Sequence, residues 1–108
     1  MATTTLDLGA IRNWESFHQV CSLTFGFPSF YGRNMDAWID CLSYLADGDG
    51  MCAYQLGPGE RLEILLPNFE KFGRECREIS SALLECTAFV NQRYVASGDM
   101  PRIALVPL

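Results

Sequence analysis

Apolar residues between positions 72 and 94 recur at steps of three and four, the spacing of one face of an α-helix. The positions are Phe72, Cys76, Ile79, Leu83, Cys86, Val90 and Tyr94. A helix with so long a buried face needs a second layer of structure to pack against. We therefore predict a long helix over residues 73–95, preceded by a single helical turn over 67–72.

The rest of the chain predicts two more helices and three short strands. Helical spacing after a capping residue, Asn13, indicates a helix over residues 14–25, and a second helix is expected over 34–46. The predicted strands are 5–8, 62–66 and 103–106, while 51–66 fits either a hairpin or a loop followed by one strand. Residues 47–50 are expected to be a flexible break. This order favours an α/β fold with a small, mostly parallel sheet covered by helices.

Composition limits the possible functions. The 108 residues are 49% hydrophobic, enough for one domain, 1–108, with a packed core. The net charge of −5 and the scattered basic residues argue against a nucleic-acid binder and favour a basic protein partner. No apolar stretch approaches the length of a membrane span, and no N-terminal signal is visible.

Catalytic and metal-binding residues are few. The single histidine, His18, falls on the apolar face of the first helix, and the five cysteines show no Cys-x-x-Cys spacing. We interpret the cysteines as small buried residues in a reducing, cytoplasmic compartment, and we expect no cofactor, no metal site and no enzymatic activity. A reactive thiol is the alternative, and a thiol–histidine enzyme would need His18 and a cysteine in one pocket.

The helix expected over residues 34–46 has two different faces. Met35, Trp38, Cys41, Leu42 and Leu45 form an apolar stripe, and Asp36, Asp40, Ser43 and Asp47 lie opposite it. Like charges four residues apart cost a helix roughly 0.2–0.5 kcal/mol, so these carboxylates are candidates for binding a partner. Alternatively, Asp36 is stabilised by the positive end of the helix dipole or pairs with Arg33, and Asp40 and Asp47 are ordinary solvated residues.

An apolar group lies beside these carboxylates. Phe30, Tyr31 and Tyr44 are near in sequence, and Ile39 lies about 60° round the helix from Asp36. Exposed together, these side chains would have the composition of a binding patch. The alternative is that Phe30 and Ile39 complete the edge of the core.

Four motifs form one combined pattern between about Ile11 and Leu45. They are Phe17-His18-Gln19, Pro28-x-Phe30-Tyr31-Gly32, Asn34-Met35-Asp36-Ala37 and Asp40-Cys41-Leu42. This pattern resembles the barstar family, small intracellular inhibitors of secreted bacterial ribonucleases. The resemblance implies a three-stranded parallel sheet packed with about four helices, and a bacterial cytoplasmic protein of the immunity or antitoxin type.

The resemblance also implies a site. In this family the second helix and the loop before it plug the cationic active site of the enzyme. Asp40 would mimic the substrate phosphate, with Asp36 as a second acidic contact and Asn34 as a polar one. The implied partner-binding residues are Phe30, Tyr31, Asn34, Asp36, Ile39, Asp40 and Ser43, and the implied partner is a basic ribonuclease or another nuclease toxin.

Several positions depart from the family pattern. Ile39 and Leu45 stand where the archetype has aromatic residues, and Arg33 replaces an acidic residue. Residues 47–60 resemble an insertion. The long helix has no clear counterpart of the family's acidic contact, and Glu85 is one candidate for it. The alternative function is a non-inhibitory protein–protein interaction domain on the same fold.

Overall fold

Three parallel strands form the sheet of this protein. The computed structural model describes residues 2–48 and 50–108. In it β1 (Ala2–Thr5), β2 (Leu62–Leu66) and β3 (Ile103–Pro107) lie in the order β1-β2-β3. The central strand pairs Leu62 with Ala2 on one side and with Ile103 on the other. These strands and their helices confirm the predicted barstar-like α/β fold.

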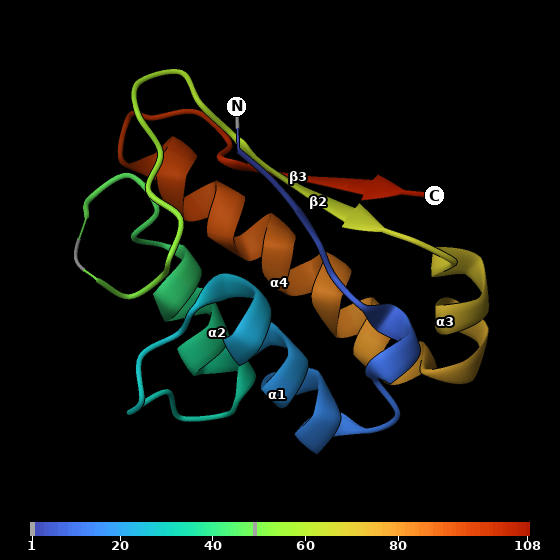
Figure 1. Ribbon diagram of the computed structural model, residues 1–108. Coiled ribbons are helices and arrows are strands. Elements are labelled where there is room, and N and C mark those ends of the chain that lie inside the picture. The colour runs from blue at the N-terminus through green and yellow to red at the C-terminus, as the bar shows by residue number, and fades with distance from the viewer. Residues whose placement is uncertain (1, 49) are drawn as a thin grey trace.

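The main helices lie on one side of this sheet (Figure 1). They are α1 (Trp14–Phe25), α2 (Met35–Leu42) and α4 (Arg77–Ala96). A 3-10 helix, η1 (Leu8–Ala10), follows β1, and α3 (Phe69–Glu75) follows β2 at one end of the sheet. None of the helices in the described ranges is long and apolar enough to cross a membrane.

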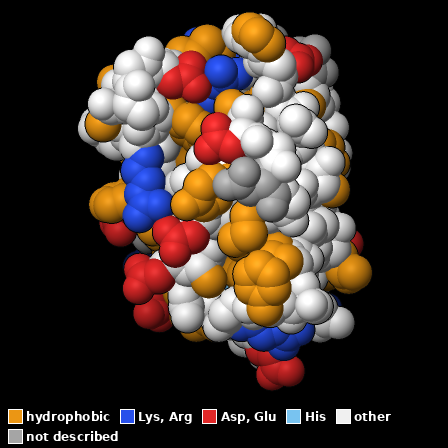
Figure 2. All heavy atoms as spheres, turned by 90° about the vertical axis from the view of Figure 1, so that its left-hand side faces the viewer, with side chains coloured by type: hydrophobic (Ala, Val, Ile, Leu, Met, Phe, Trp, Pro, Cys, Tyr) orange, Lys and Arg blue, Asp and Glu red, His pale blue; other side chains and the backbone are white. Residues whose placement is uncertain are grey.

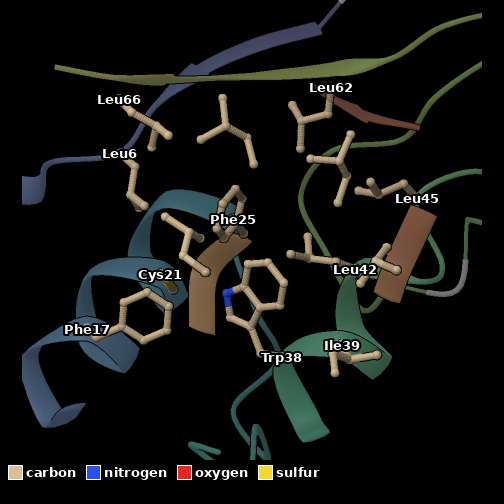
Figure 3. Close-up of a cluster of buried hydrophobic side chains, with 14 of the residues drawn as sticks. Leu6, Phe17, Cys21, Phe25, Trp38, Ile39, Leu42, Leu45, Leu62 and Leu66 are labelled. Atoms are coloured by element: carbon tan, nitrogen blue, oxygen red, sulfur yellow. The ribbon is translucent and has the colours of Figure 1, made fainter. Parts of the chain in front are cut away.

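The core lies between the sheet and the helices. Every second residue of β2 is buried, namely Leu62, Ile64 and Leu66. Figure 3 shows the side chains of the sheet facing Phe25 of α1 and Trp38 and Leu42 of α2. Trp38 is completely buried, so α2 is attached to the core by its largest side chain.

Local signals set the limits of α1 as predicted. Asn13 Oδ1 accepts a hydrogen bond from the backbone N–H of Ser16 at 2.9 Å, and Ser16 Oγ accepts one from the N–H of Asn13 at 3.0 Å. This reciprocal pair is a capping box. At the other end Gly26 has φ +65°, and a Cβ there would lie 2.6 Å from the Cβ of Ala53. Both the left-handed backbone and the close approach therefore require glycine at this position.

Two predicted elements have different limits. The first strand is Ala2–Thr5 rather than 5–8; Leu6 adds one more backbone bond to Leu65, at 3.0 Å, before the chain turns into η1. The long helix begins at Arg77 rather than 73, because Cys76 leaves the helical region with φ −126° and ψ 59°. The turn expected over 67–72 is the start of α3.

The acidic helix is shorter than predicted. We expected it to reach residue 46, but α2 ends at Leu42. The hydroxyl of Tyr94 on α4 donates to the carbonyl of Leu42 at 2.7 Å and accepts from the N–H of Leu45 at 3.0 Å. These are backbone groups that a longer helix would pair internally, so the tertiary contact replaces the next turn.

The segment 51–66 is a loop followed by one strand, and no strand other than β2 is found there. The loop is anchored by backbone bonds from Ala53 to Phe25 and from Leu56 to Leu45, each 2.7 Å long. The buried guanidinium of Arg102 donates to the carbonyls of Gly57 and Glu60, both at 2.9 Å. Asp49, part of the expected flexible break, lies outside the described residues.

Two neighbouring leucines on α4 test the packing of the core. Leu83 is completely buried, whereas the side chain of Leu84 is 47% exposed. We expect Leu83→Ala to lower the free energy of unfolding by about 2–5 kcal/mol because it leaves a cavity. The matched control Leu84→Ala should cost less than about 1 kcal/mol. Urea denaturation measures both, and similar losses in the two variants would contradict this packing.

Candidate functional site

Residues 26–34 form the loop that connects α1 to the start of α2. Asn34 is the N-cap of this helix, and its Oδ1 accepts from the N–H of Ala37 at 2.8 Å. The cap leaves the Asn34 amide nitrogen for other contacts, including a long 3.4 Å bond to the carbonyl of Gly32. Asn34 therefore lies at the expected position but uses its oxygen to begin the helix.

The two aromatic residues of this loop have different surroundings. Tyr31 is half-buried; its hydroxyl lies 2.6 Å from Nδ1 of His18 on α1, and its ring centroid lies 4.6 Å from that of Phe27. Phe30 is 73% exposed. Tyr31 thus anchors the loop to α1, and Phe30 is left at the surface with a large apolar side chain.

Asp36 and Asp40 are both exposed on α2. Asp36 lies in the first turn, where the helix dipole favours a carboxylate. Among the described residues no ion pair joins it to Arg33. Asp40 instead pairs with a residue of α4: its Oδ1 accepts from Nη1 of Arg93 at 2.9 Å. The two expected carboxylates therefore lie on one surface, and one of them has an internal partner.

Arg93 is the site residue that sequence reasoning missed. Its Nη1 also lies 3.3 Å from Oγ of Ser43, and its guanidinium carbon lies 5.3 Å from the ring centroid of Phe89. Arg93 is 53 positions from Asp40 in the chain, so no local pattern links the two. The only available signal was the spacing of Phe89 and Arg93, which places them on one face of the long helix.

The prediction that Ile39 is exposed at the border of the acidic face is wrong. Ile39 is only 8% exposed and belongs to the core cluster, and Figure 3 shows its side chain near Trp38. The alternative, completion of the core edge, holds for Ile39 but not for Phe30. Asp47 lies beyond the end of α2, so the acidic row on this helix consists of Asp36 and Asp40 alone.

The face on the left-hand side of Figure 1 is not uniformly acidic. Figure 2 shows acidic, basic and hydrophobic side chains interspersed over this face. A groove of about 480 Å³ lies beside the start of α2, and it is lined by Trp14, Glu15, His18, Arg33, Asn34 and Met35. Glu85, the candidate acidic residue of the long helix, lines a neighbouring groove with Trp14 and Met35. Burial, followed by the charges of Glu85 and Asp36, raises the pKa of Cys86.

The surroundings of the thiols do not favour a nucleophile. All five cysteines are free, and burial raises the pKa of Cys21 to about 12 and that of Cys41 to about 11. A catalytic thiol needs the opposite shift. No cysteine lines the groove that contains His18. Within residues 2–48 and 50–108 there is also no cluster of three or more His, Cys, Asp or Glu that could hold a metal ion.

Comparison with known proteins identifies the family. A family model described as Barstar (barnase inhibitor) matches residues 1–106, almost the whole chain. The chain therefore belongs to the barstar family, as residues 11–45 had suggested. A search of curated proteins found no match.

The contact between His18 and Tyr31 generates a pH-dependent prediction. Burial, and then the positive charge of Arg33, lowers the pKa of His18 from its ordinary 6.5. As the pH falls, the unfolded chain binds this proton before the folded chain does, so protonation favours unfolding. We expect the free energy of unfolding to fall between about pH 7.5 and about pH 5.5, and the fall to be smaller in His18→Gln.

Urea denaturation at the two pH values measures this effect. An identical pH dependence in the wild-type protein and in His18→Gln would contradict it, as would a wild-type protein that becomes more stable at the lower pH.

Proposed function

We propose that this member of the barstar family is a cytoplasmic inhibitor of a ribonuclease, of the immunity or antitoxin type. It would bind the cationic active site of the enzyme through α2 and the loop before it. The observation that carries the proposal is the exposure of Asp36 and Asp40 together on one short helix whose opposite face is locked into the core. Membership of a family described as barnase inhibitors supports the same conclusion.

The proposed chemistry is mimicry of a substrate phosphate by Asp40. The Asp40 side chain is 58% exposed, and Arg93 contacts only its Oδ1. Oδ2 is thus available to cations of an active site that normally bind a phosphate oxygen. Charge-assisted hydrogen bonds of this kind are stronger than neutral ones, and they strengthen further when water is excluded.

The rigidity of the support favours tight binding. Completely buried Trp38 and Leu42 hold α2 from below, and Asn34 caps its first turn. A carboxylate on so fixed a helix loses little conformational freedom on binding, which lowers the cost of association. The net charge of −5 would also speed the encounter with a basic enzyme.

The remaining proposed contacts surround these carboxylates. Phe30 and Tyr31 would supply apolar area from the loop, Asn34 its amide nitrogen, and Ser43 its hydroxyl at the end of α2. Ile39 would act only from beneath, as packing that holds the backbone of Asp40 in place, because its side chain is buried. This role differs from the direct contact expected of the aromatic residue that the family archetype has at this position.

A second candidate function is a non-inhibitory interaction domain. Some large apolar side chains of other helices are exposed: Leu23 on α1 is 80% exposed, and Leu84 on α4 is 47% exposed. Association through such residues would not depend on Asp40.

Calorimetric titration against barnase and other small microbial ribonucleases tests the proposal. We expect tight binding by the wild-type protein, and a loss of at least about 2 kcal/mol, or about thirtyfold in affinity, in Asp40→Ala. The loss arises because cations of the enzyme remain desolvated and unpaired. Asp36→Ala should weaken binding less, because this residue is the flanking contact.

Asp7→Ala is the matched control, since it removes the same charge from an exposed position at the start of η1. Its affinity should stay close to that of the wild-type protein. If Asp40→Ala bound as tightly as the wild type, α2 would not be the inhibitory site. Association that ignores both aspartates would favour the interaction domain.

A further inference from the structure

A positive charge of the protein itself lies within the proposed binding surface. The guanidinium of Arg93 is held by three groups at once: Asp40 at 2.9 Å, Ser43 at 3.3 Å and the ring of Phe89 at 5.3 Å. Its side chain nevertheless remains 46% exposed. A partner that covers Asp40 must therefore meet Arg93 as well.

We propose that Arg93 is a specificity-determining residue of this surface. Its positive charge disfavours a partner whose contact region is uniformly cationic, and it favours a partner that places a carboxylate opposite Arg93. The inference rests on the proposed function, because it concerns the same surface of α2. It refines the partner from a basic protein to one whose contact region carries both signs of charge.

The geometry lets Arg93 stay in place when a partner binds. Arg93 engages Oδ1 of Asp40 and leaves Oδ2 for a cation of the partner. Only Nη1 of Arg93 makes a side-chain hydrogen bond within the described part of the chain. A guanidinium carries five N–H donors, so Nε and Nη2 keep donors that a planar carboxylate can accept.

A uniformly cationic partner has two unfavourable options. It can bind with its own cations beside Arg93, and the repulsion between like charges then grows as water is excluded. Alternatively, it can displace Arg93 from Asp40, which also ends the contacts with Ser43 and Phe89. Either option weakens binding to such a partner, and an acidic group in the partner removes the repulsion.

A charge series at position 93 tests this inference, with barnase as the probe because the family is described by its inhibition. The inhibition constant is measured for wild type, Arg93→Lys, Arg93→Ala and Arg93→Glu. We expect Arg93→Ala to inhibit at least about threefold more tightly than wild type, and Arg93→Glu more tightly still. Arg93→Lys keeps the charge and should stay within about twofold of the wild type.

Arg74→Ala is the control, because Arg74 is also exposed and also pairs with a carboxylate, Glu70 on α3, at 2.7 Å. It should leave inhibition unchanged. Inhibition that depends on Asp40 but is unchanged or weakened in Arg93→Ala would overturn the inference and leave the proposed function intact. Absence of inhibition of barnase and of the other small microbial ribonucleases, in wild type and in every Arg93 variant, would overturn both.

Discussion

The hydroxyl of Tyr94 makes the contact on which the geometry of this surface depends. It is buried between α4 and the end of α2, where it donates to the carbonyl of Leu42 and accepts from the N–H of Leu45. Burial is the main cause that raises its pKa to about 12, so the hydroxyl keeps its proton at ordinary pH. This one group ends α2, fixes the following turn, and holds α4 where Arg93 reaches Asp40.

The proposed inhibitory surface follows from that attachment. One face of α2 is buried against the core, so Asp36 and Asp40 lie on the opposite, exposed face. The loop before α2 is held separately, by the contact of Tyr31 with His18 of α1. A ribonuclease would thus meet two elements that are each fastened to the same core, and little rearrangement would be needed to bind.

Local signals in the sequence were sufficient for much of the fold. The limits of α1 were predictable because Asn13 caps the helix through nearby Ser16, and Gly26 adopts the left-handed backbone that ends it. Tertiary contacts decided the rest: Tyr94 ends α2 early, and the packing of α2 buries Ile39. The positions of Asp36 and Asp40 on one surface were predictable from helical spacing. The ion pair of Asp40 with Arg93 was not, because it joins two helices distant in the chain.

The central claim is that a ribonuclease binds α2 and the loop before it. The most direct measurement is to titrate the isotope-labelled protein with barnase while following its backbone amide signals by nuclear magnetic resonance. We expect the largest changes at Phe30, Asp36, Asp40 and Ser43, with little change in β1 or α3. Changes centred instead on the exposed residues Leu84 and Val95 of α4, with α2 unaffected, would contradict it.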